Sequence, residues 1–206
     1  MLRSFIVLLV TTTAFGCNPA GNPDASPRDS RLSGASPSNA TADSAISMDT
    51  LLHRFQAGLP RHDTLTGAVA SREALTRRYL AAVARFDTGA LRGMHITRAE
   101  YAYLYFPSSK MMKPPYELPP DAAWLLHTAE SNKGIASVMR RFGGQRFELE
   151  SVRCPGEPLR EGANVVWRDC VVRYRGEGAG VHERPLFAAI IEREGRFKFF
   201  SYATPL

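Results

Sequence analysis

The spacing of apolar residues changes at Gly143-Gly144, and this change constrains the fold more than any other feature. Before the glycine pair, apolar residues recur every three or four positions, as in Leu75, Tyr79 and Val83, which places them on one face of a helix. After it, residues 147–152 alternate between apolar and polar, which is typical of a strand. Helices followed by strands predict an α+β domain, with N-terminal helices packed on a curved antiparallel sheet of about four strands.

Capping residues and glycines predict where the first helices lie. Ser47 is a suitable N-cap for a helix that stops near Gly58, and Ser71 is one for a longer helix that reaches about Phe86. Residues 87–91 are expected to form a short turn.

The middle of the chain is first aromatic and then rich in proline. Thr97 and Glu100 have the spacing of a capping box, which predicts a short helix over 101–106. Residues 107–120 contain five prolines and are expected to form an irregular loop. Pro120 suits the first turn of a helix that runs to about residue 142, with a predicted interruption at Gly134.

The last part of the chain contains four segments with the composition of strands, at 147–152, 164–174, 185–191 and 196–203. Glu194-Gly195 separates the last two by two residues, which predicts a tight hairpin. No internal repeat is found. With the polar leader set aside, residues 47–206 have a length typical of one globular domain.

The N-terminus has the parts of an export signal. Arg3 precedes an apolar run over 5–10, and Cys17 follows soon after. The run resembles a bacterial lipoprotein signal peptide with its lipobox. This resemblance implies that residues 1–16 are removed, that Cys17 is acylated with palmitate or a similar chain, and that a residue other than Asp at Asn18 directs the protein to the outer membrane. An ordinary cleaved signal followed by an incidental cysteine is the alternative.

Residues 17–46 are dominated by Pro, Ser, Gly, Ala, Asn and Asp. A segment with so few large apolar residues cannot bury enough surface to offset the entropy lost on ordering. It is therefore expected to act as a tether after the lipidated Cys17, with a reach of roughly 30 Å. The predicted location is the cell envelope, with the domain in the periplasm or outside.

Cys154 and Cys170 remain as a pair once Cys17 carries the lipid. A hairpin centred on Gly162 places Leu159 opposite Val165, and the same register places the two cysteines opposite each other. Opposed residues of an antiparallel pair are close enough for a disulfide, which persists in an oxidising compartment. Two free thiols or a metal-binding pair are the alternatives.

The chain has a formal net charge of +6. Its basic residues are scattered, and no long basic run with interleaved aromatic residues is found. This positive charge could attract anionic lipid headgroups, but the favoured interpretation is that the basic residues simply form a solvated surface. Nucleic-acid binding is not expected for an exported protein.

The run 80–91 and the final hairpin 187–202 are similar to segments of the nuclear-transport-factor-2-like superfamily. The likeness covers residues 71–206. It implies a cone-shaped α+β domain. The superfamily includes ketosteroid isomerases, dehydratases and noncatalytic binding domains, so the fold alone does not assign a function.

The five histidines show no metal-ligand spacing, so neither a metal nor a cofactor is expected. The candidate site is an aromatic and polar cluster from the middle of the chain: Tyr101, Tyr103, Tyr105, Lys110, Lys113, Tyr116, Trp124 and His127. In this cluster His127 is a candidate general base that Glu130, one turn later, would orient. The alternative is that the aromatic residues only pack a helix against the sheet.

Two main functions follow. The favoured one is a membrane-anchored envelope lipoprotein that acts as a binding module for a small hydrophobic ligand or an envelope protein. The other is a small-molecule enzyme with isomerase- or dehydratase-like acid–base chemistry in a pocket between sheet and helices. A structural envelope protein without a ligand is a third possibility. The lack of a dense carboxylate or histidine cluster favours binding over catalysis.

Overall fold

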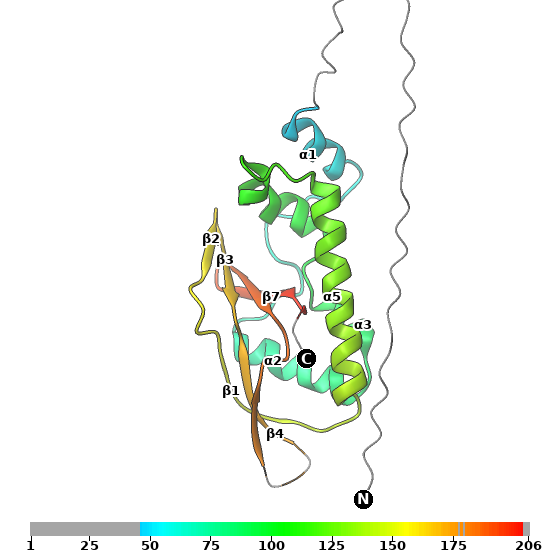
Figure 1. Cartoon of the computed structure of the whole chain (residues 1–206), viewed down its shortest axis with the longest axis vertical. Helices are drawn as coiled ribbons and strands as arrows, with labels where there is room; N and C mark the ends of the chain where they lie inside the picture. The colour runs from blue at the N-terminus through cyan, green and yellow to red at the C-terminus, as the bar shows by residue number, and fades with distance from the viewer. Residues whose placement is uncertain (1–45, 177, 179, 204–206) are drawn as a thin grey trace, which may run out of the picture. The chain divides into compact units, whose positions relative to one another are not determined.

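In the computed structural model, which describes residues 46–203 except 177 and 179, helices come first and antiparallel strands follow. Figure 1 shows the long helix α5 (Pro120–Phe142) on one side and the strands on the other. The predicted α+β class, with helices packed on antiparallel strands, is confirmed. The predicted signal peptide, Cys17 and all but the last residue of the tether lie outside the described residues.

Both predicted serine caps are confirmed. Ser47 caps α1 (Met48–Gln56), with its Oγ accepting a hydrogen bond from the Thr50 N–H at 3.3 Å. Ser71 caps α2 (Arg72–Ala84) through the Ala74 N–H at 3.1 Å. Each cap satisfies one amide that the first helical turn leaves without a partner.

The turn predicted at residues 87–91 is wrong, because residues 88–91 belong to the helix α3 (Thr88–Gly93) and Asp87 is its N-cap. Asp87 starts it by accepting a hydrogen bond from the Ala90 N–H at 2.8 Å. Leu91 is fully buried and fixes the helix to the core. A helix of six residues is too short to show the apolar period that longer helices reveal.

The predicted capping box is confirmed at the start of α4 (Arg98–Glu100), where Thr97 and Glu100 exchange hydrogen bonds of 3.1 and 2.7 Å. The aromatic segment after it is a π-helix rather than an α-helix. The proline-rich segment begins with short 3-10 turns. These three segments are η1 (Tyr101–Tyr105), η2 (Phe106–Ser108) and η3 (Lys110–Met112).

The predicted interruption of α5 at Gly134 is wrong, since the helix continues through it. Gly134 has a different role. A Cβ atom at this position would collide with the backbone of Tyr202, so glycine allows α5 to lie directly against the segment that follows the last strand. This close approach brings residues of α5 next to that segment.

The strands form two antiparallel sheets with orders β1-β4-β5 and β2-β3-β6-β7. The predicted segment 164–174 divides in two at Asp169, whose φ of 55° breaks the extended backbone. The two-residue turn predicted at Glu194-Gly195 is confirmed by the pairing of the residues on either side of it. The strands are β1 (Glu148–Arg153), β2 (Leu159–Glu161), β3 (Asn164–Arg168), β4 (Val171–Arg175), β5 (Val181–Arg184), β6 (Ala189–Arg193) and β7 (Arg196–Ser201).

The Cys154–Cys170 disulfide is confirmed, with Cα atoms 3.9 Å apart. The register predicted at the tip of the hairpin is wrong by one residue, because Leu159 lies opposite Val166. The turn there is Gly162-Ala163, two residues long, instead of one centred on Gly162. In β1–β4 the predicted register holds from Ser151 to Arg153 and slips by one residue at Leu149, and Arg153 opposite Val171 places the cysteines next to each other. The irregular segment between β1 and β2 contains the extra residue that accounts for this one-residue difference in register.

Two apolar clusters form the core. One contains Tyr79, Phe187, Phe199 and other residues of α2, the strands and the C-terminal half of α5. The other lies around α1 and η1 and contains Phe55 and Tyr101. The candidate site described next contacts residues of both clusters.

Candidate functional site

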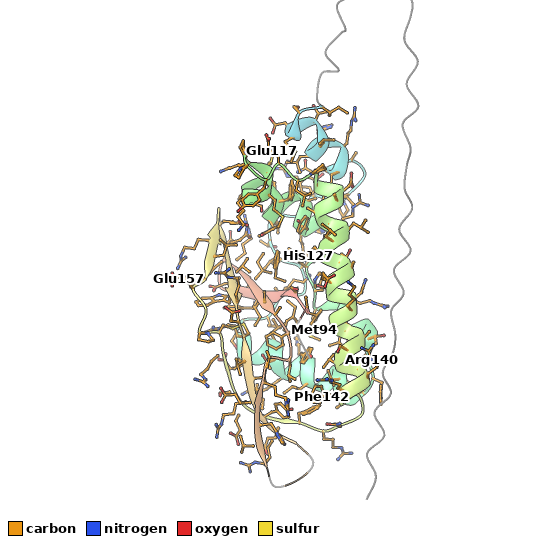
Figure 2. The ribbon with its side chains drawn as sticks, in the orientation of Figure 1. Met94, Glu117, His127, Arg140, Phe142 and Glu157 are labelled. Atoms are coloured by element: carbon orange, nitrogen blue, oxygen red, sulfur yellow. A yellow bond between two sulfur atoms is a disulfide. The ribbon has the colours of Figure 1, made fainter. Side chains whose placement is uncertain are left out.

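Three of the predicted site residues come together in the structure. The ring of Tyr101 in η1 lies 5.1 Å from that of Trp124 and 5.3 Å from that of His127, measured between centroids. Trp124 and His127 follow each other on α5 with centroids 5.7 Å apart. Figure 2 labels His127 on the side of α5 that faces the strands, where Phe200 of β7 packs against it at 4.6 Å.

Two other predicted residues lie elsewhere. Tyr103 packs beneath α1, and its hydroxyl donates to the Gln56 carbonyl oxygen at 3.1 Å. Glu130 is exposed and pairs with Lys133 at 2.6 Å. Within the described part of the chain, no hydrogen bond joins Glu130 to His127, so the expected orienting contact is not formed.

The rest of the predicted cluster is dispersed. Tyr105 packs against Phe200 with ring centroids 4.6 Å apart. The ammonium of Lys110 lies 5.4 Å from the ring centroid of Tyr116, and Tyr116 and Lys113 are exposed. The aromatic part of the prediction therefore describes a packed interior, and its lysines lie on the surface of the proline-rich segment.

His95 is the residue that the sequence did not indicate. It follows α3 and is held beside β7, because the Ile96 N–H donates to the Phe199 carbonyl at 2.9 Å and the Phe199 N–H donates to the Met94 carbonyl at 2.9 Å. Its ring lies 5.1 Å from that of His127 and 5.7 Å from that of Tyr202. No motif surrounds His95 in the sequence, and the position depends entirely on contacts between distant segments.

The hydrogen bonds of His95 define its protonation. Its Nδ1 lies 2.8 Å from the Ile96 carbonyl oxygen, which can only accept, so Nδ1 carries the hydrogen. In the neutral ring Nε2 is then an acceptor, and the Ser131 hydroxyl lies 3.0 Å from it. Ser131 also accepts a long hydrogen bond of 3.4 Å from the Tyr202 N–H. His95 and Ser131 thereby connect α5 with the end of the last strand.

Both imidazoles are uncharged at neutral pH. Burial lowers the pKa of His95 to about 4. Burial, with repulsion from His95, lowers the pKa of His127 to about 3. The Nε2 atom of His127 is buried and has no hydrogen-bond partner among the described residues. A charged imidazole would be costly in this position, because burial penalises the charge and none of the described residues forms an ion pair with it.

A small cleft of about 200 Å³ opens beside His95, between α3 and α5. Trp124 forms an aromatic wall, and Ser131 and His95 lie at its base. The exposed guanidinium of Arg92 lies at its edge, and none of the ion pairs in the described part of the chain involves it. The lining residues are Arg92, His95, Ile96, Trp124, Thr128, Ser131, Asn132 and Ile135.

The cleft can offer a ligand one cation, one amide, two hydroxyls, the imidazole of His95, the aromatic face of Trp124 and two isoleucines. Within residues 46–203 as described, no group of three or more His, Cys, Asp or Glu side chains is arranged to hold a metal ion. The described helices include none that is long and apolar enough to cross a membrane. No family model matches the chain, and no curated protein or solved structure is significantly similar to it.

Proposed function

We propose that this protein is a lipid-anchored component of the bacterial cell envelope, with a nuclear-transport-factor-2-like domain that binds a small ligand. The anchoring part rests on the lipobox-like sequence that ends at Cys17 and on the polar tether that follows it. The disulfide between Cys154 and Cys170 supports export, because disulfides persist in oxidising compartments.

The observation that carries the binding proposal is the cleft beside Arg92. It combines an unpaired cation with the wall formed by Trp124, and such a mixture of apolar surface and few polar groups is typical of ligand sites. Its volume of about 200 Å³ lies below the roughly 300–1,000 Å³ of drug-sized pockets, so the cleft suits only a small ligand such as a single ring with a short acidic chain. The ligand would have an apolar or aromatic body against Trp124 and a carboxylate or similar anionic group at Arg92.

Binding is favoured over acid–base catalysis by the state of the histidines. His127, the predicted general base, does not line the cleft and is packed among aromatic rings. A general base works best when its pKa lies near the working pH, and both imidazoles have pKa values of about 4 or below.

The binding proposal can be tested with a set of small carboxylates. Benzoate, phenylacetate, cinnamate and hexanoate, each beside its neutral amide, would be titrated into the mature protein by calorimetry. We expect at least one acid to bind and its amide to bind at least ten-fold more weakly. Arg92→Met should cause a similar loss, while Arg78→Met, an exposed arginine outside the cleft, should cause none. Equal binding by wild type and Arg92→Met would contradict the proposal.

The anchor can be tested in cells. Labelled palmitate should be incorporated into the wild-type protein and not into Cys17→Ala, and globomycin should cause the uncleaved precursor to accumulate. If the wild-type chain incorporates no label, the anchoring proposal is wrong, and the calorimetric result still decides the binding proposal independently.

A second candidate function is favoured by one observation, the hydrogen bond between His95 and Ser131 at the base of the cleft. With a pKa of about 4 the neutral imidazole of His95 is a weak base, and it could take up a ligand proton only through the Ser131 hydroxyl, which would pass its own hydrogen to Nε2 and serve slow isomerase- or dehydratase-like chemistry. Proton NMR in D₂O would detect exchange of ligand C–H groups. Exchange that is lost in Ser131→Ala would support this function, and exchange no faster than in buffer would exclude it for the ligands used.

A further inference from the structure

A second surface, separate from the cleft, lies where β1 meets α2. β1 pairs with β4 along one side, and among the described residues no strand pairs with its other side. The backbone N–H and C=O groups that point outward from β1 therefore have no strand partner. Such an edge is a template onto which an extended chain can add.

A groove of about 570 Å³ runs between α2 and the start of β1. Leu80 and Ala84 of α2 form one apolar side, and Phe147 and Leu149 form the other. The exposed Ala81 lies between them and leaves the groove open because its side chain is small. The groove is thus bounded by a helix on one side and by an edge strand on the other.

The charge at the groove is positive. Arg77 of α2 and Arg146, just before β1, both line it and are exposed. Neither takes part in any of the ion pairs found among the described residues, and Glu148 is the one acidic residue in the lining. Further along the same sheet, by contrast, Arg173 is paired with Glu150 at 2.8 Å.

We infer that β1 and α2 bind an extended, acidic peptide segment of another envelope protein, which adds to the sheet as a strand beside β1. Main-chain hydrogen bonds to β1 would supply affinity without much dependence on sequence. Alternate side chains of the peptide would lie against Leu80 and Phe147, and the acidic ones would meet Arg77 and Arg146. This surface does not depend on the ligand proposed for the Arg92 cleft.

The inference is tested with a pool of fluorescent heptapeptides whose alternate positions are Asp or Glu and whose other positions are Val, Ile, Leu or Thr. Fluorescence anisotropy with the mature protein would measure binding of the pool and of its best member. We expect that N-methylation of alternate backbone amides in that member, on the side that faces β1, weakens binding at least ten-fold. N-methylation on the opposite side should change it less than two-fold.

Substitutions in the groove provide a second test of the proposed peptide binding. Arg77→Glu, which reverses the charge, and Ala81→Glu, which fills the groove and repels acidic side chains, are both at exposed positions of α2 and should each weaken the best peptide at least ten-fold. Arg78→Glu is the matched control, since Arg78 is exposed on the same helix but does not line the groove. Unchanged circular dichroism and melting temperature would show that each variant is folded.

Three results would overturn the inference. The first is no binding by the pool at 1 mM peptide, a concentration at which even weak strand addition is measurable. The second is equal binding by the two N-methylated peptides, which would mean that the backbone of β1 takes no part. The third is a dimer of the protein in light scattering, with the amides of β1 protected from hydrogen exchange, because the occupant would then be a second copy of the chain.

Discussion

The Glu100–Lys198 pair is buried beside β7, and the His95–His127 pair beside the same strand is buried at His95 and half-buried at His127, yet the first pair carries two charges and the second carries none. The two charged side chains are 0% and 2% exposed and lie 2.8 Å apart. The two imidazoles lie 5.1 Å apart between ring centroids and have pKa values far below 6.5. Polar groups in neighbouring parts of one core are thus accommodated in two ways, one pair as a charged ion pair and the other as two neutral rings.

The difference lies in the donors that each region provides. One oxygen of Glu100 accepts from the N–H and the hydroxyl of Thr66 at 2.6 and 2.7 Å, and the other accepts from the Thr97 N–H and from Lys198. Burial alone would raise the pKa of Glu100, but these hydrogen bonds and the charge of Lys198 outweigh it and lower the pKa. Neither imidazole forms an ion pair with a described residue, and burial outweighs the weaker attraction of Glu100 for His95, so both rings are more stable in the neutral form.

The largest expected effect is the loss of stability on mild acidification. The pKa values of His95 and His127 fall from 6.5 in the unfolded chain to about 4 and about 3 in the folded one. The stability due to these depressed values is complete above pH 6.5 and is lost as the pH falls towards 4, because only the unfolded state gains the protons. We expect a loss on the order of 4 kcal/mol between pH 6.5 and 4.5.

Urea unfolding at half-unit pH steps measures this loss. The pH range from 6.5 to 4.5 reports on the histidine pair alone. Glu100 has a lowered pKa, so its contribution to stability is lost only below its ordinary value of 4.5. A free energy of unfolding that stays constant between pH 6.5 and 4.5 would show that the imidazoles become protonated in the folded state, and the contrast between the two pairs would fail.

The next effect concerns the charged pair at neutral pH. Lys198→Met leaves the Glu100 carboxylate buried without its cation, which costs at least about 3 kcal/mol of unfolding free energy. Adding Glu100→Gln should recover part of this loss, since the second change removes the unpaired charge. Lys133→Met, which breaks the exposed pair with Glu130, should cost less than about 1 kcal/mol. Similar losses in Lys198→Met and Lys133→Met would contradict the assigned role of burial.

The sequence predicts the local features of this core and fails at its distant contacts. The Thr97–Glu100 capping box can be predicted from the sequence because both partners lie within one helical turn. The partner of Glu100 is 98 residues away in the chain, and Ser131 lies 36 residues from His95. No residue spacing encodes these pairs, because they depend on how the helices pack on the strands.

Gly134 is a second case in which a contact with a distant segment cannot be predicted from the local sequence. Glycine has a low intrinsic helix propensity, so a glycine in the middle of α5 predicts a break in the helix. The structure shows that the missing side chain is required for contact with the backbone of Tyr202. The aromatic cluster was predicted in part, since Tyr101, Trp124 and His127 do meet, but the cleft beside Arg92 and His95 depends on the position of α3 against α5.

A smaller effect is expected when His95 is replaced. His95→Phe keeps an aromatic ring beside Tyr202 but leaves the Ile96 carbonyl and the Ser131 hydroxyl without their partner. Buried polar groups without partners are costly, and we expect a loss of about 2 kcal/mol at pH 7. Equilibrium unfolding in urea measures it, and a loss within experimental error would mean that water or a rearranged Ser131 replaces the imidazole.

The smallest effect is expected at His127, although it lies in the same cluster. Its Nε2 has no hydrogen-bond partner among the described residues, and the Phe200 backbone only partly offsets the lowering of its pKa by burial. His127→Phe removes the unpartnered atom from the core, so we expect a change within about 1 kcal/mol at pH 7. The same variant should halve the acid sensitivity between pH 6.5 and 4.5, because one of the two depressed groups is gone. An unchanged acid profile would show that His127 does not contribute to the uncharged pair, and His95 alone would then account for the contrast with Glu100 and Lys198.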